Sequence, residues 1–338
     1  MTNIDRLDIV ATTMSGSIKD WGKIERMGPL FEKEFPGKVR MHVVDSHEEA
    51  RKAARQACAE GSRVVVSAGG AGTFNRVVQG VLEGAKDLGS MRLGFLRKGS
   101  ADLIGKALGV SDVVEESVRQ ISEGIRSENL LPCDVIRVSE DGNPETRNFV
   151  GFGGLETVGD IPYFTESFLI KYYKGILGYF FGDLGPFRVG TTLAVATWMT
   201  RKFAFRQHRF RLSVDGKDLP GDRYISILLI NGDLGPDMPF YRGCSLGAGE
   251  FYLLALRDLG LGKIPGQAVG SFNGDVLKEP ARWGMETRVV KRELRVVPLM
   301  DPPRPFRVNI DGLKWSASFG LSFKLSGKLN LISARKRG

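Results

Sequence analysis

Residues 69–73 read Gly-Gly-Ala-Gly-Thr and directly follow a run of β-branched and small residues at 64–68. Glycine has no Cβ, so a glycine-rich turn between a buried strand and a helix lets backbone N–H groups approach a phosphate. The alternative is a tight strand-to-helix turn in which the hydroxyl of Thr73 caps the helix. Ala71 has no oxygen that could order a metal ion. The turn therefore predicts a phosphate site in which residue 71 cannot help to hold a metal ion.

Two common nucleotide-binding motifs are excluded at this turn. It lacks the Gly-Lys-Ser/Thr ending of a P-loop, and it is not a complete Gly-x-Gly-x-x-Gly fingerprint. A Rossmann dehydrogenase would carry that fingerprint after its first strand, where residues 12–16 read Thr-Thr-Met-Ser-Gly. The nucleotide, if one binds, is held by another kind of loop.

The elements around the turn alternate between strand and helix patterns. Strands are expected at residues 7–12, 39–44, 64–68 and 92–96, with helical spacing of apolar residues between them. This order predicts a parallel sheet with helices on its faces. Ligands of such sheets bind beyond the carboxyl ends of the strands. The loops at 12–16, near Ser46, at 69–73 and at 99–102 are therefore expected to meet in one crevice.

After about residue 130 strand patterns dominate, and short strands with turn signals predict an antiparallel β-sandwich. The expected strands are 131–138, 147–152, 205–214, 224–231, 251–256, 287–297, 306–310 and 321–331. Asp215-Gly216 and Asp311-Gly312 lie between such runs and predict two-residue hairpin turns. We therefore expect an α/β nucleotide-binding domain at 1–130 and a sandwich domain at 131–338, with the last strand returning toward the first domain.

Much of the aromatic content is concentrated in residues 163–187. Aromatic residues at helical spacing predict an amphipathic helix packed on the sandwich. Two alternatives remain, a mouth for an acyl chain and a segment at a membrane interface, where aromatic rings and nearby lysines suit the headgroup region.

Composition narrows the setting of the protein. No signal peptide and no apolar run of about 18 residues are recognised, so we expect a cytoplasmic protein. The three cysteines are far apart in sequence and predict buried thiols rather than a disulfide framework or a zinc site. The 338 residues carry a formal charge of +9, which favours anionic partners, including an acidic membrane surface on the inner membrane face. Nucleic-acid binding would rest on charge alone and is not expected.

Several segments occur in the order found in one enzyme superfamily. Residues 69–81 read Gly-Gly-Ala-Gly-Thr-Phe-Asn-Arg-Val-Val-Gln-Gly-Val, where that superfamily has Gly-Gly-Asp-Gly-Thr-Leu-Asn-Glu-Val-Val-Asn-Gly-Leu. Residues 12–16 resemble its Asn-Pro-x-Ser-Gly loop, and residues 93–106 resemble its Leu-Gly-x-x-Pro-x-Gly-Thr-x-Asn-Asp-Phe-Ala-Arg segment. Further signatures correspond to residues 154–157, 231–232 and 308–312. Over nearly its whole length the chain resembles the diacylglycerol and sphingosine kinase superfamily, including its bacterial lipid kinases.

The resemblance implies an α/β domain that binds ATP, with magnesium in the cleft, and a β-sandwich that helps to bind a lipid. The family reaction transfers a phosphoryl group from ATP to a lipid hydroxyl. By position in the motifs, the implied nucleotide-binding residues are Ser15, Gly16, Ser46, Gly69, Gly70, Gly72, Thr73, Asn75, Gly99 and Ser100. Asp102 and Glu156 are the implied substrate-binding residues.

The chain departs from the family where acids are expected. Ala71 replaces the aspartate of the glycine loop, Ala248 lies in place of a carboxylate in residues 246–249, and Leu313 replaces the glutamate of an Asp-Gly-Glu motif. Arg76 replaces the glutamate after the loop asparagine. We assign no metal ligands. The nearby acids that could accept a proton are Asp102, Glu156, Asp233, Asp237, Glu250 and Asp311, of which Glu250 and Asp311 are the catalytic candidates.

Two hypotheses follow from this pattern. The first is an ATP-dependent lipid kinase, acting on a diacylglycerol, sphingoid base or ceramide, with a rearranged set of acids. The second is a degenerate kinase, or pseudokinase, that keeps the fold as a lipid- or nucleotide-binding module. An NAD kinase shares the core of the glycine turn, but residues 93–100 and the aromatic stretch are more typical of lipid kinases. A homo-oligomer is compatible with either hypothesis.

Overall fold

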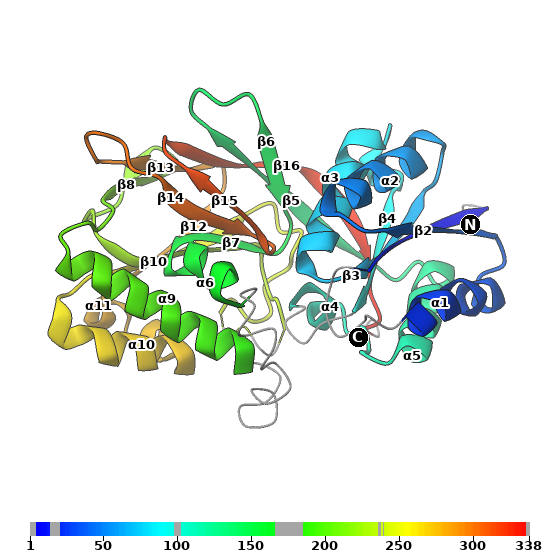
Figure 1. Ribbon diagram of the computed structural model, residues 1–338, viewed down its shortest axis with the longest axis horizontal. Coiled ribbons are helices and arrows are strands. Elements are labelled where there is room, and N and C mark those ends of the chain that lie inside the picture. The colour runs from blue at the N-terminus through cyan, green and yellow to red at the C-terminus, as the bar shows by residue number, and fades with distance from the viewer. Residues whose placement is uncertain are drawn as a thin grey trace.

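The computed structural model describes residues 5–13, 21–97, 103–165, 185–235, 238 and 240–335. Within these residues the chain forms an α/β half and a β-rich half that lie side by side (Figure 1). The first has parallel strands with helices on both faces, and the second contains an antiparallel sheet packed on a further sheet. The predicted fold class, α/β followed by a β-sandwich, is confirmed.

The α/β half begins with a strand and alternates regularly. In chain order its elements are β1 (Arg6–Thr12), α1 (Trp21–Glu34), β2 (Lys38–Val44), α2 (His47–Ala59), β3 (Val64–Gly69), α3 (Ala71–Gly84), a 3-10 turn (Leu88–Ser90), β4 (Arg92–Arg97), α4 (Leu103–Ala107) and α5 (Val114–Arg126). The strands run parallel in the order β2-β1-β3-β4. All of β3 is buried, as its run of valines requires.

Helices cover both faces of this sheet, α2 and α3 on one and α1 and α5 on the other (Figure 1). The α2–α3 contact is close because Gly80 and Gly84 present no side chain to α2. A Cβ at Gly80 would lie 2.2 Å from the carbonyl oxygen of Arg51, and one at Gly84 would lie 2.3 Å from that of Arg55. Glycine at these two positions therefore lets the carboxyl half of α3 pack closely on α2.

The β-rich half is built mainly from strands. Its elements are β5 (Leu130–Glu140), β6 (Thr146–Phe149), β7 (Phe152–Glu156), α6 (Thr157–Thr165), α9 (Gly185–Phe203), β8 (Phe210–Val214), β9 (Lys217–Asp218), β10 (Tyr224–Ile230), β11 (Phe251–Arg257), α10 (Ile264–Asn273), α11 (Pro280–Trp283), β12 (Met285–Val290), β13 (Glu293–Pro298), β14 (Phe306–Ile310), β15 (Leu313–Ala317) and β16 (Leu321–Ile332), with 3-10 turns at Leu261–Lys263 and Asp275–Leu277.

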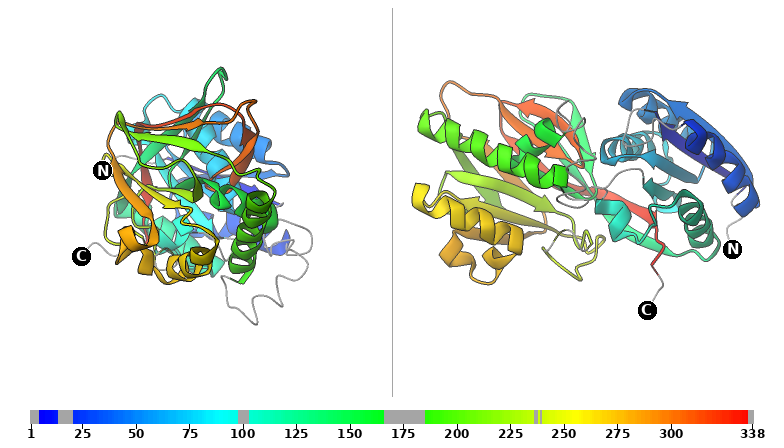
Figure 2. Two further views of the ribbon diagram at one scale, coloured as in Figure 1. Left: turned by 90° about the vertical axis from the view of Figure 1, so that its left-hand side faces the viewer. Right: turned by 60° about the horizontal axis from the view of Figure 1, so that its bottom comes forward.

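Two sheets of this half enclose one apolar core. The six-stranded sheet has the order β12-β11-β10-β7-β14-β15, and it packs on β5, β6, β8, β13 and β16. Phe210 and Phe306 meet edge to face across the core, with ring centroids 5.0 Å apart, and Phe149 meets Phe323 at 6.5 Å. Such aromatic pairs contribute beyond their burial. Helices α6, α9, α10 and α11 lie on the outer side of the six-stranded sheet (Figure 2).

Strand β16 belongs to both halves of the molecule. It pairs antiparallel with β5 over most of its length and with β13 at its start, and near its end Asn330 and Leu331 pair in parallel with β4. The parallel sheet therefore continues into a ten-stranded mixed sheet that joins the two halves. β16 therefore links the two halves through backbone hydrogen bonds to β4, β5 and β13.

Several element boundaries differ from the predicted ones. The expected strand at 147–152 is two strands, β6 and β7, and the one at 287–297 is β12 and β13, separated by a turn. The strand expected from residue 205 begins only at Phe210, after α9. Most of the aromatic stretch at 163–187 lies outside the described residues. The turn between β6 and β7 is Val150-Gly151, whose apolar residue continues the strand pattern, and the two-residue turn at Lys291-Arg292 contains no glycine or proline that would mark it.

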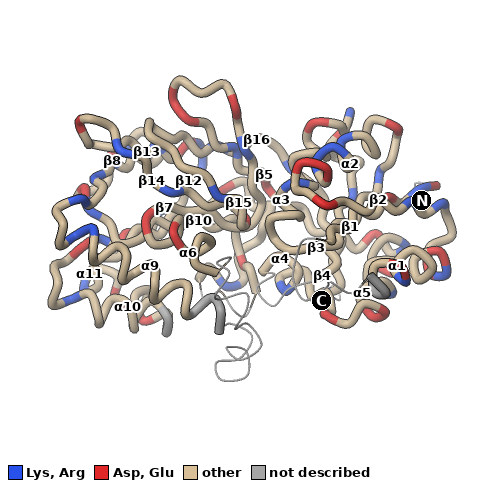
Figure 3. The backbone as a smooth tube through the Cα atoms, in the orientation of Figure 1, with Lys and Arg blue, Asp and Glu red and all other residues tan. Residues whose placement is uncertain are grey.

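None of the helices in the described ranges is long and apolar enough to cross a membrane. Lysine and arginine occur in both halves of the molecule, interspersed with aspartate and glutamate (Figure 3). The excess of positive charge therefore does not mark one half as a basic surface. Whether a site suits an anionic ligand therefore depends on the charges close to that site rather than on the net charge of the protein.

Candidate functional site

The glycine loop links β3 to α3 and leaves the amino end of that helix open. Gly70 is the N-cap, with φ −87° and ψ −179°, and no side chain caps the helix. Thr73 is therefore not the cap. The first intrahelical bond runs from the Phe74 N–H to the Gly70 carbonyl, at 3.0 Å. The preceding N–H groups have no intrahelical partner, and the helix dipole places partial positive charge on them, so they suit an anion.

Close packing explains why the loop contains glycine. A Cβ at Gly69 would lie 2.7 Å from the Cβ of Thr73. A Cβ at Gly72 would lie 3.2 Å from the imidazole of His47, the first residue of α2. Thr73 is 1% exposed, and its hydroxyl has no hydrogen-bond partner among the described residues. The amino ends of α2 and α3 thus come together at this loop.

A hairpin turn of the β-rich half reaches the same point. Asp311 and Gly312 connect β14 to β15 with positive φ angles of 45° and 81°, which confirms the predicted two-residue turn. A Cβ at Gly312 would lie 3.3 Å from the backbone nitrogen of Gly72 and 3.4 Å from the Cβ of Ala71. The turn therefore lies against the first residues of α3.

The Asp311 carboxylate is buried and receives three backbone hydrogen bonds. Val150 and Phe152 donate at 2.8 Å, and Gly151 donates at 3.1 Å. Burial raises the pKa of Asp311 to about 6, although these N–H groups and the side chain of Asn75 act in the opposite direction. A carboxyl with such a pKa changes its protonation state near neutral pH, and its ionised form could accept a proton.

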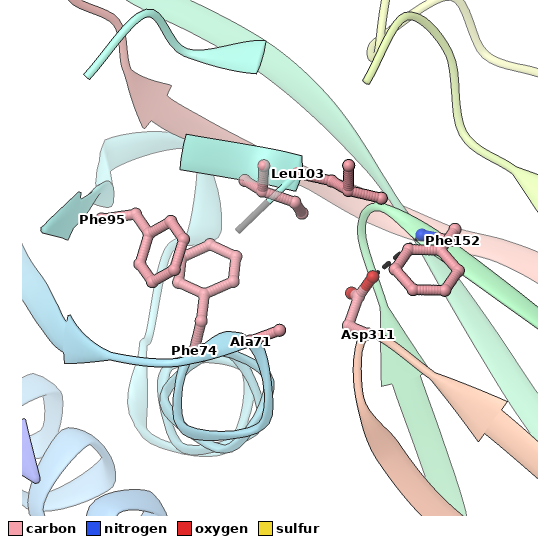
Figure 4. A pocket seen from close by; sticks show the side chains of 7 residues that line it. Ala71, Phe74, Phe95, Leu103, Phe152 and Asp311 are labelled. Atoms are coloured by element: carbon pink, nitrogen blue, oxygen red, sulfur yellow. Dashed lines mark hydrogen bonds between the residues drawn. The ribbon is translucent and has the colours of Figure 1, made fainter. Parts of the chain in front are cut away.

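Ala71 and Asp311 face each other across a small pocket between the two halves (Figure 4). Its other lining residues are apolar, namely Phe74, Phe95, Leu103, Ile104 and Phe152. The rings of Phe74 and Phe95 pack with centroids 4.7 Å apart. The space of about 10 Å³ is enough for roughly one water molecule. Among the described residues of this lining Asp311 alone is charged, and the methyl group of Ala71 lies opposite it.

Two implied nucleotide-binding residues have structural roles at this junction. The Asn75 amide donates to the carbonyl of Asn148 on β6, at 2.9 Å, and so ties α3 to the β-rich half. Ser46 is the N-cap of α2, where its hydroxyl accepts the N–H of Glu49 at 3.1 Å. Both positions border the loop and remain predictions as ligand contacts. Ser15, Gly16, Gly99, Ser100 and Asp102 lie outside the described residues, as does Asp237.

The other candidate acids lie apart from the pocket. Glu156, at the end of β7, is buried and holds the imidazole of His208, with Oε1 and Nδ1 2.6 Å apart. Glu250 accepts the hydroxyl of Tyr252 at 3.0 Å. Asp233 accepts the backbone N–H groups of Gly235 and Gly243. Of the candidate acids in the described ranges, only Asp311 lines the pocket.

The substituted acid positions differ in their surroundings. Ala248 is exposed on a loop, whereas Leu313 is 9% exposed and belongs to the sandwich core. Within the described part of the chain no group of three or more histidine, cysteine, aspartate or glutamate side chains is placed to hold a metal ion. Because Mg²⁺ needs oxygen ligands, these residues do not fit the magnesium site that the resemblance implies.

Two residues near the loop were not among the predicted site residues. His47 lies beside Gly72, and the only sequence signal for it is its position after β2, next to Ser46. Arg76 was noted only as a replaced glutamate, yet it lies on α3 one turn beyond Gly72 and its buried Nε–H has no hydrogen-bond partner among the described residues. Finding them required the packing of α2, α3 and β6.

Comparisons with known proteins agree with this geometry. Residues 7–138 match the family model of the diacylglycerol kinase catalytic domain. A candidate diacylglycerol kinase from Bacillus anthracis str. Sterne has a similar structure, with a TM-score of 0.68 and 17% identity over 98% of this chain and 96% of that one. A diacylglycerol kinase from the same organism gives 0.64 and 14% over 98% of both chains. No curated protein matches. The predicted resemblance is confirmed, and the structural matches show the fold.

Proposed function

We propose that this lipid kinase-like protein, whose residues 7–138 carry the diacylglycerol kinase catalytic domain, binds the phosphates of ATP at the glycine loop and is a catalytically degenerate kinase. One observation carries the proposal. The open amino end of α3 is present, whereas the residue that faces Asp311 across the pocket is Ala71. A phosphate cradle is thus combined with a site that lacks the implied acid.

The phosphate-binding part of the proposal rests on the backbone. The N–H groups of Ala71, Gly72 and Thr73 begin α3, and no side chain caps this end of the helix. An anion placed there would be stabilised by these donors and by the helix dipole. Each interaction is made by the main chain, so it does not depend on the substituted side chains. Binding can therefore survive the loss of the acids.

Phosphoryl transfer makes further demands. The charge that develops on the transferred group has to be neutralised, and the attacking hydroxyl has to lose its proton. When bound, a divalent metal supplies the neutralisation in kinases generally, but the described residues here do not fit one. Loss of a general base alone lowers a rate by about 10²- to 10⁴-fold. These deficits favour a binding protein over a fast enzyme.

The second candidate is an active lipid kinase with ATP as phosphoryl donor and a diacylglycerol, sphingoid base or ceramide as acceptor. Asp311 favours it, because its pKa of about 6 would let it accept a hydroxyl proton near neutral pH and it lines the pocket. Against this role, both carboxylate oxygens already accept backbone N–H groups. A substrate hydroxyl would have to compete with those bonds.

An assay with γ-labelled ATP separates the two candidates. The protein is incubated with anionic vesicles that contain diacylglycerol, sphingosine or ceramide, in buffers with Mg²⁺, Mn²⁺ or Ca²⁺. A degenerate kinase yields no labelled lipid although ATP binds. Labelled lipid at a rate of turnovers per second, abolished by Asp311→Asn, would establish the active kinase and contradict the degenerate one.

Variants of the glycine loop test the binding part. Gly72→Val places a branched side chain against His47, where even a Cβ would lie at 3.2 Å, and we expect it to abolish ATP binding. Gly262→Ala is the matched control, because a Cβ at Gly262 meets no atom within 4 Å among the described residues. Equal binding by the wild type and by Gly72→Val would show that ATP binds elsewhere.

A further inference from the structure

Arg76 is a partly buried cation that forms no ion pair with any residue the structure describes. Its Nε–H is buried without a hydrogen-bond partner, and no carboxylate of the described residues forms an ion pair with it. Withdrawing a charge from water without a partner is unfavourable. The arrangement is therefore that of a cation whose partner is a ligand rather than a side chain.

Glu48 of α2 and Glu83 of α3 already bind another arginine, Arg51 of α2. Arg51 is held by Glu83 at 2.8 Å and by Glu48 at 3.4 Å. Burial and the positive charge of Arg51 lower the pKa of Arg76, and the attraction of Glu48 offsets part of this effect. The α2 side thus supplies a competing cation and no free carboxylate.

Strand β6 likewise contributes an arginine that is already paired with a glutamate. Arg147 pairs with Glu145 at 2.9 Å, and its guanidinium lies over the ring of Trp315 on β15, 4.7 Å from the centroid. Arg147 also repels Arg76, and the attraction of Glu145 offsets part of this repulsion. The Nε1–H of Trp315 is buried and has no partner among the described residues. Two buried donors, one on α3 and one on β15, therefore have no acceptor among the described residues.

The position of this cluster relates it to the glycine loop. Arg76 follows Gly72 by four residues, so both lie on the same face of α3, one turn apart. Long side chains on a helix lean toward its amino end. The hairpin that carries Trp315 also places Gly312 beside Gly72. A ligand with more than one phosphate at the loop could therefore reach Arg76.

We propose that Arg76, Arg147 and Trp315 form a phosphate-binding site beside the glycine loop, in which arginine supplies the positive charge and no divalent metal is required. The ligand chemistry is a phosphate group, carried either by a nucleotide or by a phosphorylated lipid. Guanidinium binds phosphate through two parallel N–H donors, and an indole N–H adds a third. The identification of a nucleotide as the ligand rests on the proposed function. The existence of the anion site does not depend on it.

Calorimetric titration of pyrophosphate into the protein in EDTA tests the site directly. We expect metal-free binding that Arg76→Gln weakens by about tenfold or more, a loss typical of a charge-assisted contact. Arg51→Gln is the matched control, because it removes an equal charge that is already bound to two glutamates; we expect its effect to stay below about threefold. Absence of pyrophosphate binding, or equal losses for both variants, would overturn the proposal.

A second readout needs no variant that alters the site charge. The chain has four tryptophans, and a ¹⁵N-indole spectrum resolves their Nε1–H groups, with Trp315→Phe assigning one. Pyrophosphate should shift the Trp315 signal and leave the other three in place. An unshifted Trp315 signal at saturating pyrophosphate would contradict the site.

Two further ligands distinguish the sources of the phosphate. ATP in EDTA represents the nucleotide, and vesicles that contain phosphatidate represent the lipid. If the vesicles shift the Trp315 signal and calorimetry detects no ATP binding, the site binds lipid phosphate, and the nucleotide proposal fails while this inference holds. If ATP binds but neither shifts the Trp315 signal nor depends on Arg76, the inference fails while nucleotide binding at the loop stands.

Discussion

The ionisation of Asp311 should destabilise the folded protein as the pH rises toward neutral. Burial raises the pKa of this carboxyl from an ordinary 3.8 to about 6. The folded state therefore holds the proton more tightly than the unfolded state does. The stabilisation is complete below pH 3.8 and is lost as the pH rises through 6. A shift of about 2.2 units at about 1.36 kcal/mol per unit corresponds to ~3 kcal/mol.

Asp311→Asn isolates this effect, because the amide cannot ionise. We expect the free energy of unfolding of the wild type, minus that of the variant, to fall by ~3 kcal/mol between about pH 3 and pH 7. Urea unfolding at each pH measures both values, and contributions from other groups cancel in the difference. The substitution also changes the free energy of unfolding by an amount that does not depend on pH. This amount does not affect the test, because only the change with pH is compared.

Asp215 provides a matched control with the same backbone environment. It also opens a two-residue hairpin turn, with φ 51°, and accepts the backbone N–H groups of residues 291, 292 and 293. Burial acts to raise its pKa, but these bonds outweigh burial and lower it. For Asp215→Asn the difference should be nearly constant above pH 4 and fall only in acid. A flat difference for Asp311→Asn would refute the dominance of burial at Asp311.

Three other substitutions or reactions test separate parts of the structure. Gly80→Ala places a Cβ 2.2 Å from a carbonyl oxygen of α2 and should lower the free energy of unfolding by about 1–3 kcal/mol, with Gly262→Ala unchanged in the same urea titration. Glu156→Ala leaves the buried His208 without its hydrogen-bond partner and should cost about 1–3 kcal/mol, visible as a lower Tm; an unaltered Tm would disprove the pairing. In the folded protein a thiol reagent should modify Cys244 alone, since the other two cysteines are buried; a second modified thiol would contradict that burial.

The local sequence was sufficient to predict those elements whose formation depends mainly on neighbouring residues. The buried strand β3 was recognisable from its valines, and the two Asp-Gly turns from their position between strand patterns. Strand β16 was recognisable as a strand, but its pairing with β4 was not determined by any local pattern. Helix α9 went unrecognised because its core residue Trp198 and its packing on α6 become apparent only in the tertiary structure.

The candidate site divides in the same way. The glycine loop and the substituted Ala71 were apparent in the sequence, because a phosphate loop is a contiguous motif. The approach of Asp311 to Ala71 depends on the contact between the two halves of the molecule. The missing counter-ion of Arg76 is likewise a property of α2, α3 and β6 together. The replacement of a glutamate by Arg76 was visible in the sequence. Its effect could not be predicted, because it depends on residues that are distant along the chain.

The central claim is that the protein binds ATP phosphates with its backbone and its own cations rather than through a divalent metal. Isothermal titration of ATP into the wild-type protein, once in Mg²⁺ and once in EDTA, measures this directly. The account predicts the same Kd, within about threefold, in both buffers. Binding that appears only with Mg²⁺, or the absence of binding in both, would contradict it.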